Sequence, residues 1–108
     1  MDLRRYVTES GKDVVGSWLA DLDDATARAR IAARISRLEA DNFGDCKPVG
    51  GGVWELRVDW GPGYRVYYAR VGATVVLLLC GGDKRKQQAD IERAKAMLKD
   101  YKQRTKQR

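Results

Sequence analysis

Basic side chains that could bind a phosphate lie in three short segments of the second half of the chain. Arg57 ends the segment WELR, Arg65 ends GPGYR, and Lys84 follows GGD. Arg85 and Lys86 come directly after Lys84. Arginine can bind a phosphate through two parallel hydrogen bonds, and lysine adds a compact positive charge. The three segments therefore predict a site for an anionic, phosphate-bearing substrate.

Aromatic and acidic residues accompany these basic positions. Tyr64 and Tyr67 flank Arg65 and carry rings that could stack on an RNA base. Glu55 and Asp90 supply carboxylates, which could transfer protons or could hold the basic side chains in place. The chain has no histidine, so any proton transfer falls to carboxylate, lysine, arginine or tyrosine side chains.

Each of these features also has an ordinary structural interpretation. Charged side chains on neighbouring strands could be cross-strand pairs on a solvated face, and strand tyrosines commonly pack in a core. The run DKRK at 83–86 could be a solvated helix start. Basic residues there oppose the helix dipole by roughly a few tenths of a kcal/mol each, which a bound anion would offset. Gly81 and Gly82 could let the backbone approach such an anion, or could form only the corner between strand and helix.

Three consecutive strands are expected to position the basic residues. Residues 53–60 alternate between apolar and polar side chains, which predicts a half-buried strand whose polar face carries Glu55 and Arg57. After the turn GPG, residues 64–71 predict the returning strand, and the apolar run at 75–80 predicts a strand in the sheet interior. Such an antiparallel meander would bring the three basic side chains to one face or one end of the sheet.

Helices account for most of the remaining chain. The apolar spacing and the turn residues predict these elements: a short strand at 2–8, a helix capped by Asp13, a second helix from Asp23 or Asp24 to about Ala40, a linker at 41–52, and a C-terminal helix at about 86–104. The two N-terminal helices should form an antiparallel hairpin. We therefore expect one α+β domain over residues 1–108, with an antiparallel meander, an N-terminal helical hairpin and a C-terminal helix.

Charge and composition limit the kinds of function that are open. The net charge is +6, and residues 51–108 carry thirteen Lys/Arg against six Asp/Glu, whereas residues 1–50 carry eight against nine. A one-sided positive charge predicts a polyanionic partner, first of all nucleic acid. Cys46 and Cys80 lie far apart, so neither a zinc site nor a disulfide framework is expected. With no signal peptide or membrane span apparent, we expect a cytoplasmic protein without a metal or cofactor.

The segment at residues 53–95 closely resembles the RelE/HigB-type toxins of bacterial type II toxin–antitoxin modules. The matching motifs are WELR at 54–57, GPGYRVYY at 61–68 and LLLCGGDKRKQQADI at 77–91. More narrowly, the chain is similar to the branch described as addiction module killer protein, or phage-derived HigB-like toxin. The opening RRYVTESGKDVVGSWLADLDDATARARI also fits the N-terminal strand and helix pair of that branch.

This resemblance implies a RelE/ParE-like fold and a metal-independent endoribonuclease that cleaves mRNA, in the best-known members on the ribosome. It also implies a hetero-oligomer with a cognate antitoxin that carries a helix-turn-helix domain. By motif, Arg57, Arg65 and Lys84 match the family's basic positions, and Asp90 lies near a C-terminal acidic or tyrosine position. Glu55 is a possible base, and Lys84 or Tyr64 a possible acid.

Two other function classes stay open. A ParE-like toxin would bind a protein target such as gyrase, and would cause DNA damage without cleaving mRNA. A non-catalytic nucleic-acid-binding module would show salt-dependent binding without growth arrest. The sequence favours the endoribonuclease because the motifs and the basic second half point the same way.

Overall fold

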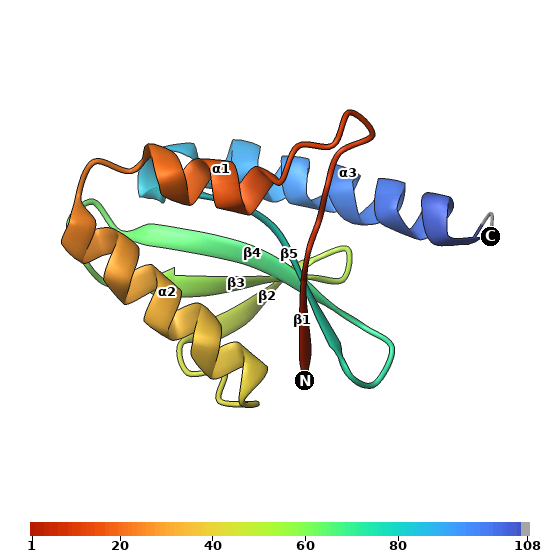
Figure 1. The fold of residues 1–108 in the computed structure, drawn as a ribbon, viewed down its shortest axis with the longest axis horizontal. Helices are drawn as coiled ribbons and strands as arrows, with labels where there is room; N and C mark the ends of the chain where they lie inside the picture. Colours follow the sequence, from red (N-terminus) through yellow and green to blue (C-terminus); the bar gives the residue numbers. More distant parts are fainter. Residues whose placement is uncertain (107–108) are drawn as a thin grey trace.

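The computed structural model describes residues 1–106 and contains one five-stranded sheet with helices packed against it (Figure 1). The strands are β1 (Asp2–Arg5), β2 (Cys46–Gly50), β3 (Val53–Val58), β4 (Tyr64–Val71) and β5 (Val75–Asp83). Their spatial order is β1-β5-β4-β3-β2, in which β2 to β5 form antiparallel neighbours and β1 runs parallel to β5. The predicted α+β class is confirmed, and β1 extends the meander at one edge.

Three α-helices and one short turn complete the fold. They are α1 (Val14–Asp21), α2 (Ala25–Glu39), the 3₁₀ turn η1 (Lys84–Lys86) and α3 (Gln87–Lys106). Asp13 caps α1 by accepting a hydrogen bond from the Gly16 amide, and Asp24 caps α2. These side chains satisfy amides that a helix start leaves without a partner. Of the two residues considered for the second cap, Asp24 is therefore the one used. Among residues 1–106, no helix combines the length and apolar character needed to cross a membrane.

The sheet is covered on both faces. One core lies under α2, whose inward side chains are Ile31, Ile35 and Leu38. The other core lies under α3, whose inward side chains are Ile91, Ala94 and Leu98. Leu56 of β3 belongs to the α2 side and Val53 to the α3 side. Because side chains alternate along a strand, Glu55 and Arg57 point to the side covered by α3.

Two segments differ from the sequence-based expectation. The expected linker at 41–52 contains β2, an edge strand in which Lys47 pairs with Glu55 in register. Pro48 and the glycines hide this strand in the sequence, yet a proline is compatible with a sheet edge. Gly81 and Gly82 lie inside β5 and do not form a corner. A Cβ at these positions would collide with the Trp18 ring and the Asp90 carboxylate, so close packing requires glycine there.

Candidate functional site

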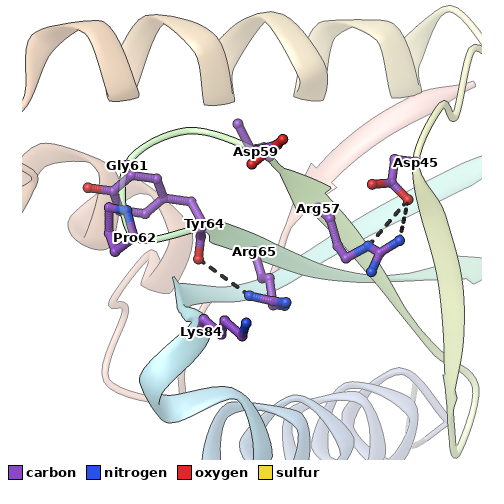
Figure 2. Close-up of a pocket in the computed structure, with 10 residues that line it drawn as sticks. Asp45, Arg57, Asp59, Gly61, Pro62, Tyr64, Arg65 and Lys84 are labelled. Carbon is purple, nitrogen blue, oxygen red and sulfur yellow. Dashed lines mark hydrogen bonds and ion pairs between the residues drawn. The ribbon is translucent and has the colours of Figure 1, made fainter.

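A pocket of about 420 Å³ lies at the end of the sheet where β3 ends, β4 begins and β5 ends (Figure 2). Its lining includes the GPG turn and three of the basic side chains singled out in the sequence: Arg57, Arg65 and Lys84. Tyr64 also lines it, together with two carboxylates, Asp45 and Asp59. The structure thus brings the three basic segments together, with cationic side chains outnumbering acidic ones. We refer to this hollow as the sheet-end pocket.

Strand register explains this convergence. Arg57 and Arg65 lie directly opposite each other on β3 and β4, and Gly82 lies opposite Arg65 on β5. The backbone amide of Lys84 donates to the carbonyl of Gly63 over 2.9 Å, which ties η1 to the GPG turn. Like charges in directly opposed positions destabilise a sheet unless each has a counter-charge. The two arginines meet this requirement with different carboxylates.

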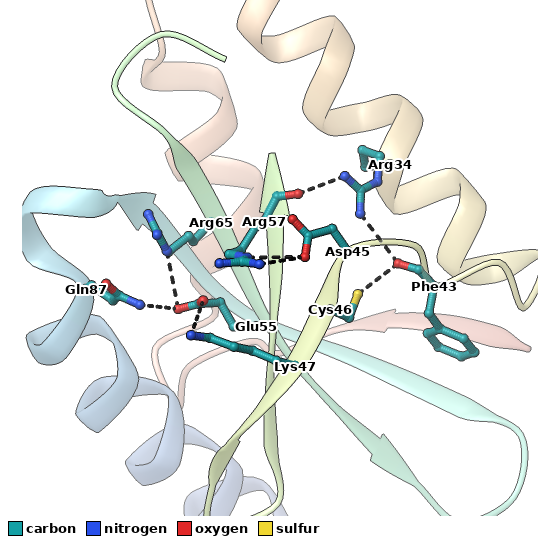
Figure 3. Close-up of polar contacts among 9 residues, drawn as sticks. All are labelled: Arg34, Phe43, Asp45, Cys46, Lys47, Glu55, Arg57, Arg65 and Gln87. Carbon is teal, nitrogen blue, oxygen red and sulfur yellow. Dashed lines mark hydrogen bonds and ion pairs between the residues drawn. The ribbon is translucent and has the colours of Figure 1, made fainter. Parts of the chain in front are cut away.

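Arg65 is held by a buried carboxylate (Figure 3). Its Nε lies 3.4 Å from Oε2 of Glu55, whose side chain is 0% exposed. The same Oε2 accepts hydrogen bonds from Nε2 of Gln87 at 2.9 Å and the hydroxyl of Tyr67 at 3.2 Å. Lys47 Nζ lies 3.9 Å from Oε1. Removing a carboxylate from water is unfavourable unless such partners surround it, so this cluster fixes Glu55 and, through it, Arg65.

Arg57 is held by an exposed carboxylate instead (Figure 3). Its Nε and Nη2 donate to Oδ1 of Asp45 over 3.2 and 2.9 Å. Donating hydrogen bonds to Asp45 raises the pKa of Arg57, so the guanidinium stays charged at every ordinary pH. Sequence reasoning missed Asp45 because it precedes β2, the strand that was itself missed. The sequence offered one indication of its role, namely a carboxylate in the expected linker that could pair with a basic side chain.

The remaining basic residues lie outside the pocket lining. Arg85 is exposed, and its Nη2 contacts Oδ2 of Asp83 at 2.8 Å. The hydrogen bond from Arg85 lowers the pKa of Asp83, which also caps η1. Lys86 is exposed on the same turn. These two side chains follow Lys84 on η1 without lining the pocket, and their role in RNA binding stays a prediction.

Three predicted site residues are buried. Tyr67 is 0% exposed in the core under α3, so the prediction that its ring stacks on an RNA base is wrong. Burial, and next the charge of Glu55, raise the pKa of its phenol. Glu55 is positioned to hold Arg65, the second of the two roles considered for it. Asp90 is also buried, pairs with Arg93 at 3.1 Å and does not line the sheet-end pocket. Glu55 and Tyr67 are buried because α3 covers their side of the sheet, and Asp90 is buried because it lies on the face of α3 that packs against Gly82 of β5.

Fold and site together define a small α+β protein with a cationic pocket at one end of an antiparallel sheet. Residues 17–102 match the family described as Phage derived protein Gp49-like (DUF891), and the chain belongs to this family. A protein of Haemophilus influenzae (strain ATCC 51907 / DSM 11121 / KW20 / Rd), described as an uncharacterized protein, is 50% identical over 84 residues. That alignment covers 78% of this chain and 85% of the relative. The matched family range includes every residue named above in the pocket lining.

Proposed function

We propose that this chain is the toxin of a type II toxin–antitoxin module and that it cleaves mRNA. The observation that carries the proposal is the convergence of Arg57, Arg65 and Lys84 on one pocket. Those residues belong to the three motifs that resemble RelE/HigB-type toxins. Membership of a phage-derived family supports the proposal, because the HigB-like branch that the motifs resemble is also phage-derived.

The proposed reaction uses the RNA's own 2′-hydroxyl as the nucleophile. The 2′-oxygen gives its proton to a solvent water molecule and bonds to the adjacent phosphorus, and the bond from phosphorus to the 5′-oxygen breaks. The 5′-oxygen takes up a proton, so the products are a 2′,3′-cyclic phosphate and a 5′-hydroxyl. Negative charge builds up on the phosphorane, where Arg57 and Arg65 would stabilise it. Lys84 or Tyr64 would protonate the leaving oxygen.

The partners of this proposed toxin follow from its charge and from its acid–base groups. Glu55 and Asp90 are buried and engaged, so alignment of the 2′-hydroxyl for attack would come from mRNA bound on the ribosome. We further propose a helix-turn-helix antitoxin whose carboxylates cover Arg57 and Lys84. Both proposals place the protein in the cytoplasm, where its substrate is translated.

A short induction of the gene in a bacterial host tests the proposal. Growth should stop, and end mapping of cellular RNA should reveal new 5′-hydroxyl ends inside translated regions. Lys84→Ala is the cleanest inactivating variant because this side chain is exposed and its loss leaves no buried partner. Arg65→Ala should also abolish cleavage, although it leaves Glu55 without its main counter-charge. Lys99→Ala removes an equal charge from α3, outside the sheet-end pocket, and should stay fully toxic.

Three outcomes would overturn the proposal or its site. Full toxicity of the Lys84 and Arg65 variants, with normal folding, would contradict the assignment of the pocket. Growth arrest with DNA damage and intact transcripts would favour a gyrase-binding, ParE-like toxin. Salt-dependent RNA binding without growth arrest would favour a non-catalytic binding module.

A further inference from the structure

A second hollow adjoins the sheet-end pocket on the side of α2. It has a volume of about 290 Å³ and is lined by six residues: Arg30, Ala33, Arg34, Arg37, Val58 and Asp59. Val58 and Asp59 also line the sheet-end pocket, so the two hollows meet at the end of β3. We refer to this second hollow as the arginine groove.

The arginines of this groove share one face of α2. Arg30, Arg34 and Arg37 are spaced by four and three residues, so they follow one another over about 10 Å of helix at 1.5 Å per residue. The buried residues Ile31 and Ile35 fix the rotation of α2 and thereby direct the arginines away from its core. A row of this length can face more than one phosphate of an extended strand.

The row has no paired counter-charge among residues 1–106, although one carboxylate, Asp59, lines the same groove. Within residues 1–106, none of the three arginines forms an ion pair with a carboxylate, whereas Arg57 and Arg65 each do. Like charges four residues apart destabilise a helix by roughly a few tenths of a kcal/mol. A polyanion lying in the groove would supply the missing counter-charge.

Arg34 connects the row to the sheet-end pocket, and Arg30 connects it to the segment that follows β3. Nη1 of Arg34 donates to the backbone carbonyl of Arg57 over 2.7 Å, and its Nη2 reaches the carbonyl of Phe43 at 3.5 Å (Figure 3). The guanidinium of Arg30 stacks over the ring of Trp60, 4.0 Å from the ring centroid. The Trp60 indole nitrogen donates to Asp24 over 3.1 Å, which fixes the ring orientation. The groove therefore pairs a row of cations with a stacked, planar platform of the kind that accepts a base.

We infer that the arginine groove is a second RNA subsite, continuous with the sheet-end pocket. This inference rests on the proposed function and extends it. The phosphate to be cleaved occupies the sheet-end pocket, and the same single strand crosses Val58 and Asp59 into the groove. Arg30 and Arg37 bind its sugar–phosphate backbone, and Arg34 positions the end of β3. A guanidinium binds protein carboxylates as readily as phosphates, but the continuity with the pocket and the Arg30–Trp60 platform favour RNA.

The test measures binding of uncleavable RNA to the purified protein. Fluorescence anisotropy with 2′-O-methyl oligouridines of increasing length, from two to eight nucleotides, reports affinity separately from cleavage. In the wild type, affinity should rise about tenfold once the strand is long enough to reach the groove. The double variant Arg30→Ala/Arg37→Ala should lose this rise but keep its affinity for the dinucleotide. Its slope of log affinity against log salt should fall by about 1.4, since each phosphate contact on a single strand contributes about 0.7.

A charge-matched control distinguishes RNA binding in the arginine groove from non-specific electrostatic attraction to the protein. Lys99→Ala/Lys102→Ala removes two charges from a separate hollow on α3 and should keep the rise with length. Equal losses in both double variants, or no rise with length in the wild type, would overturn the inference. A poly-glutamate peptide that competes as well as the longest RNA would assign the groove to a protein partner instead.

The failure of this inference is distinguishable from failure of the proposed function. The cleavage experiment measures RNA ends in cells and depends on Lys84. The groove experiment measures RNA binding by the purified protein and depends on Arg30 and Arg37. A wild-type protein that cleaves mRNA but shows no rise in affinity with RNA length would overturn only the second subsite. An intact length effect without any cleavage would overturn only the endonuclease activity.

Discussion

Arg57 and Arg65 face each other across β3 and β4, yet their environments are opposite in kind. The side chain of Arg65 is 11% exposed and its carboxylate partner Glu55 is fully buried. The side chain of Arg57 is 43% exposed and its partner Asp45 is 52% exposed. Exposed pairs contribute about 0–1 kcal/mol, whereas breaking a buried pair is strongly destabilising. One arginine is thus part of the fold, and the other is free to exchange its partner.

This difference suggests a division of labour within the proposed phosphate site. Glu55 holds Arg65 through Nε, and the far end of the guanidinium faces the pocket, where Nη1 donates a long hydrogen bond of 3.4 Å to the carbonyl of Gly63. Asp45 occupies the donors of Arg57 that a phosphate oxygen would also use. A substrate would therefore displace Asp45 easily and would leave Glu55 in place. Four predictions test this contrast.

Removing Glu55 should have the largest effect. Glu55→Ala leaves Arg65 with an unpaired charge and leaves the donors of Tyr67 and Gln87 without their acceptor. We expect the free energy of unfolding to fall by about 3–5 kcal/mol, the usual loss when one partner of a buried ion pair is removed. Urea denaturation followed by circular dichroism measures it.

Two further variants control this result. Glu92→Ala removes an exposed glutamate whose partners within residues 1–106 are Lys95 and Gln88 of the same helix, and should change stability by no more than about 0.5 kcal/mol. Glu55→Gln keeps a hydrogen-bond acceptor without the charge, and should fall between the two. Equal stabilities of the Glu55→Ala and Glu92→Ala variants would contradict the structural role of Glu55.

Alkaline pH should destabilise the buried cluster through Tyr67. The ordinary pKa of a tyrosine side chain is 10.0, and burial beside Glu55 raises the pKa of Tyr67 above this value. The folded state therefore keeps a proton that the unfolded state loses, so this stabilisation is present below pH 10 and is lost as pH rises above it. The expected decline is about 1.4 kcal/mol per pH unit for one proton. Tyr67→Phe should show a shallower decline above pH 10, and identical slopes in both proteins would refute the assignment.

Much of this architecture was predictable from local patterns. The alternation in β3, the GPG turn and the apolar run of β5 define an antiparallel meander, and its register brings Arg57 opposite Arg65. Alternation shows which residues share a face of a strand, but it does not show which face another element covers. For Glu55 and Tyr67 that element is α3, which lies far along the chain. Their burial was therefore not readable from β3 and β4 alone.

Other features depended on contacts that no local pattern contains. Asp45 reaches Arg57 only because β2 pairs with β3, and Pro48 and Gly50 make β2 resemble a loop. A glycine at position 82 looks the same in the sequence whether it turns the chain or makes room for the side chain of Asp90. Tertiary packing decides such cases, because a glycine satisfies either requirement.

Replacing the exposed carboxylate of Asp45 should hardly change stability but should raise the affinity for RNA. Asp45→Asn should change the free energy of unfolding by less than about 1 kcal/mol, because solvent already weakens its pair with Arg57. It should raise the affinity for an uncleavable RNA dinucleotide about three- to tenfold, since Arg57 no longer has a competing anion. Asp21→Asn makes the same charge change on α1 and should leave dinucleotide affinity nearly unchanged. An equal gain in affinity in both variants would mean that net charge, and not the release of Arg57, causes the effect.

The smallest expected effect is the salt dependence of the two ion pairs, and its measurement is the most direct test of the contrast between them. Double-mutant cycles with alanine at Asp45 and Arg57, and at Glu55 and Arg65, isolate each coupling energy from the cost of truncation. The Debye length shrinks from about 10 Å at 0.1 M salt to about 3 Å at 1 M, and buried pairs are screened much less than exposed ones. The Asp45–Arg57 coupling should therefore lose most of its few tenths of a kcal/mol, while the Glu55–Arg65 coupling should hardly change. Equal fractional losses would mean that water reaches both pairs, and Arg65 would then be as exchangeable as Arg57.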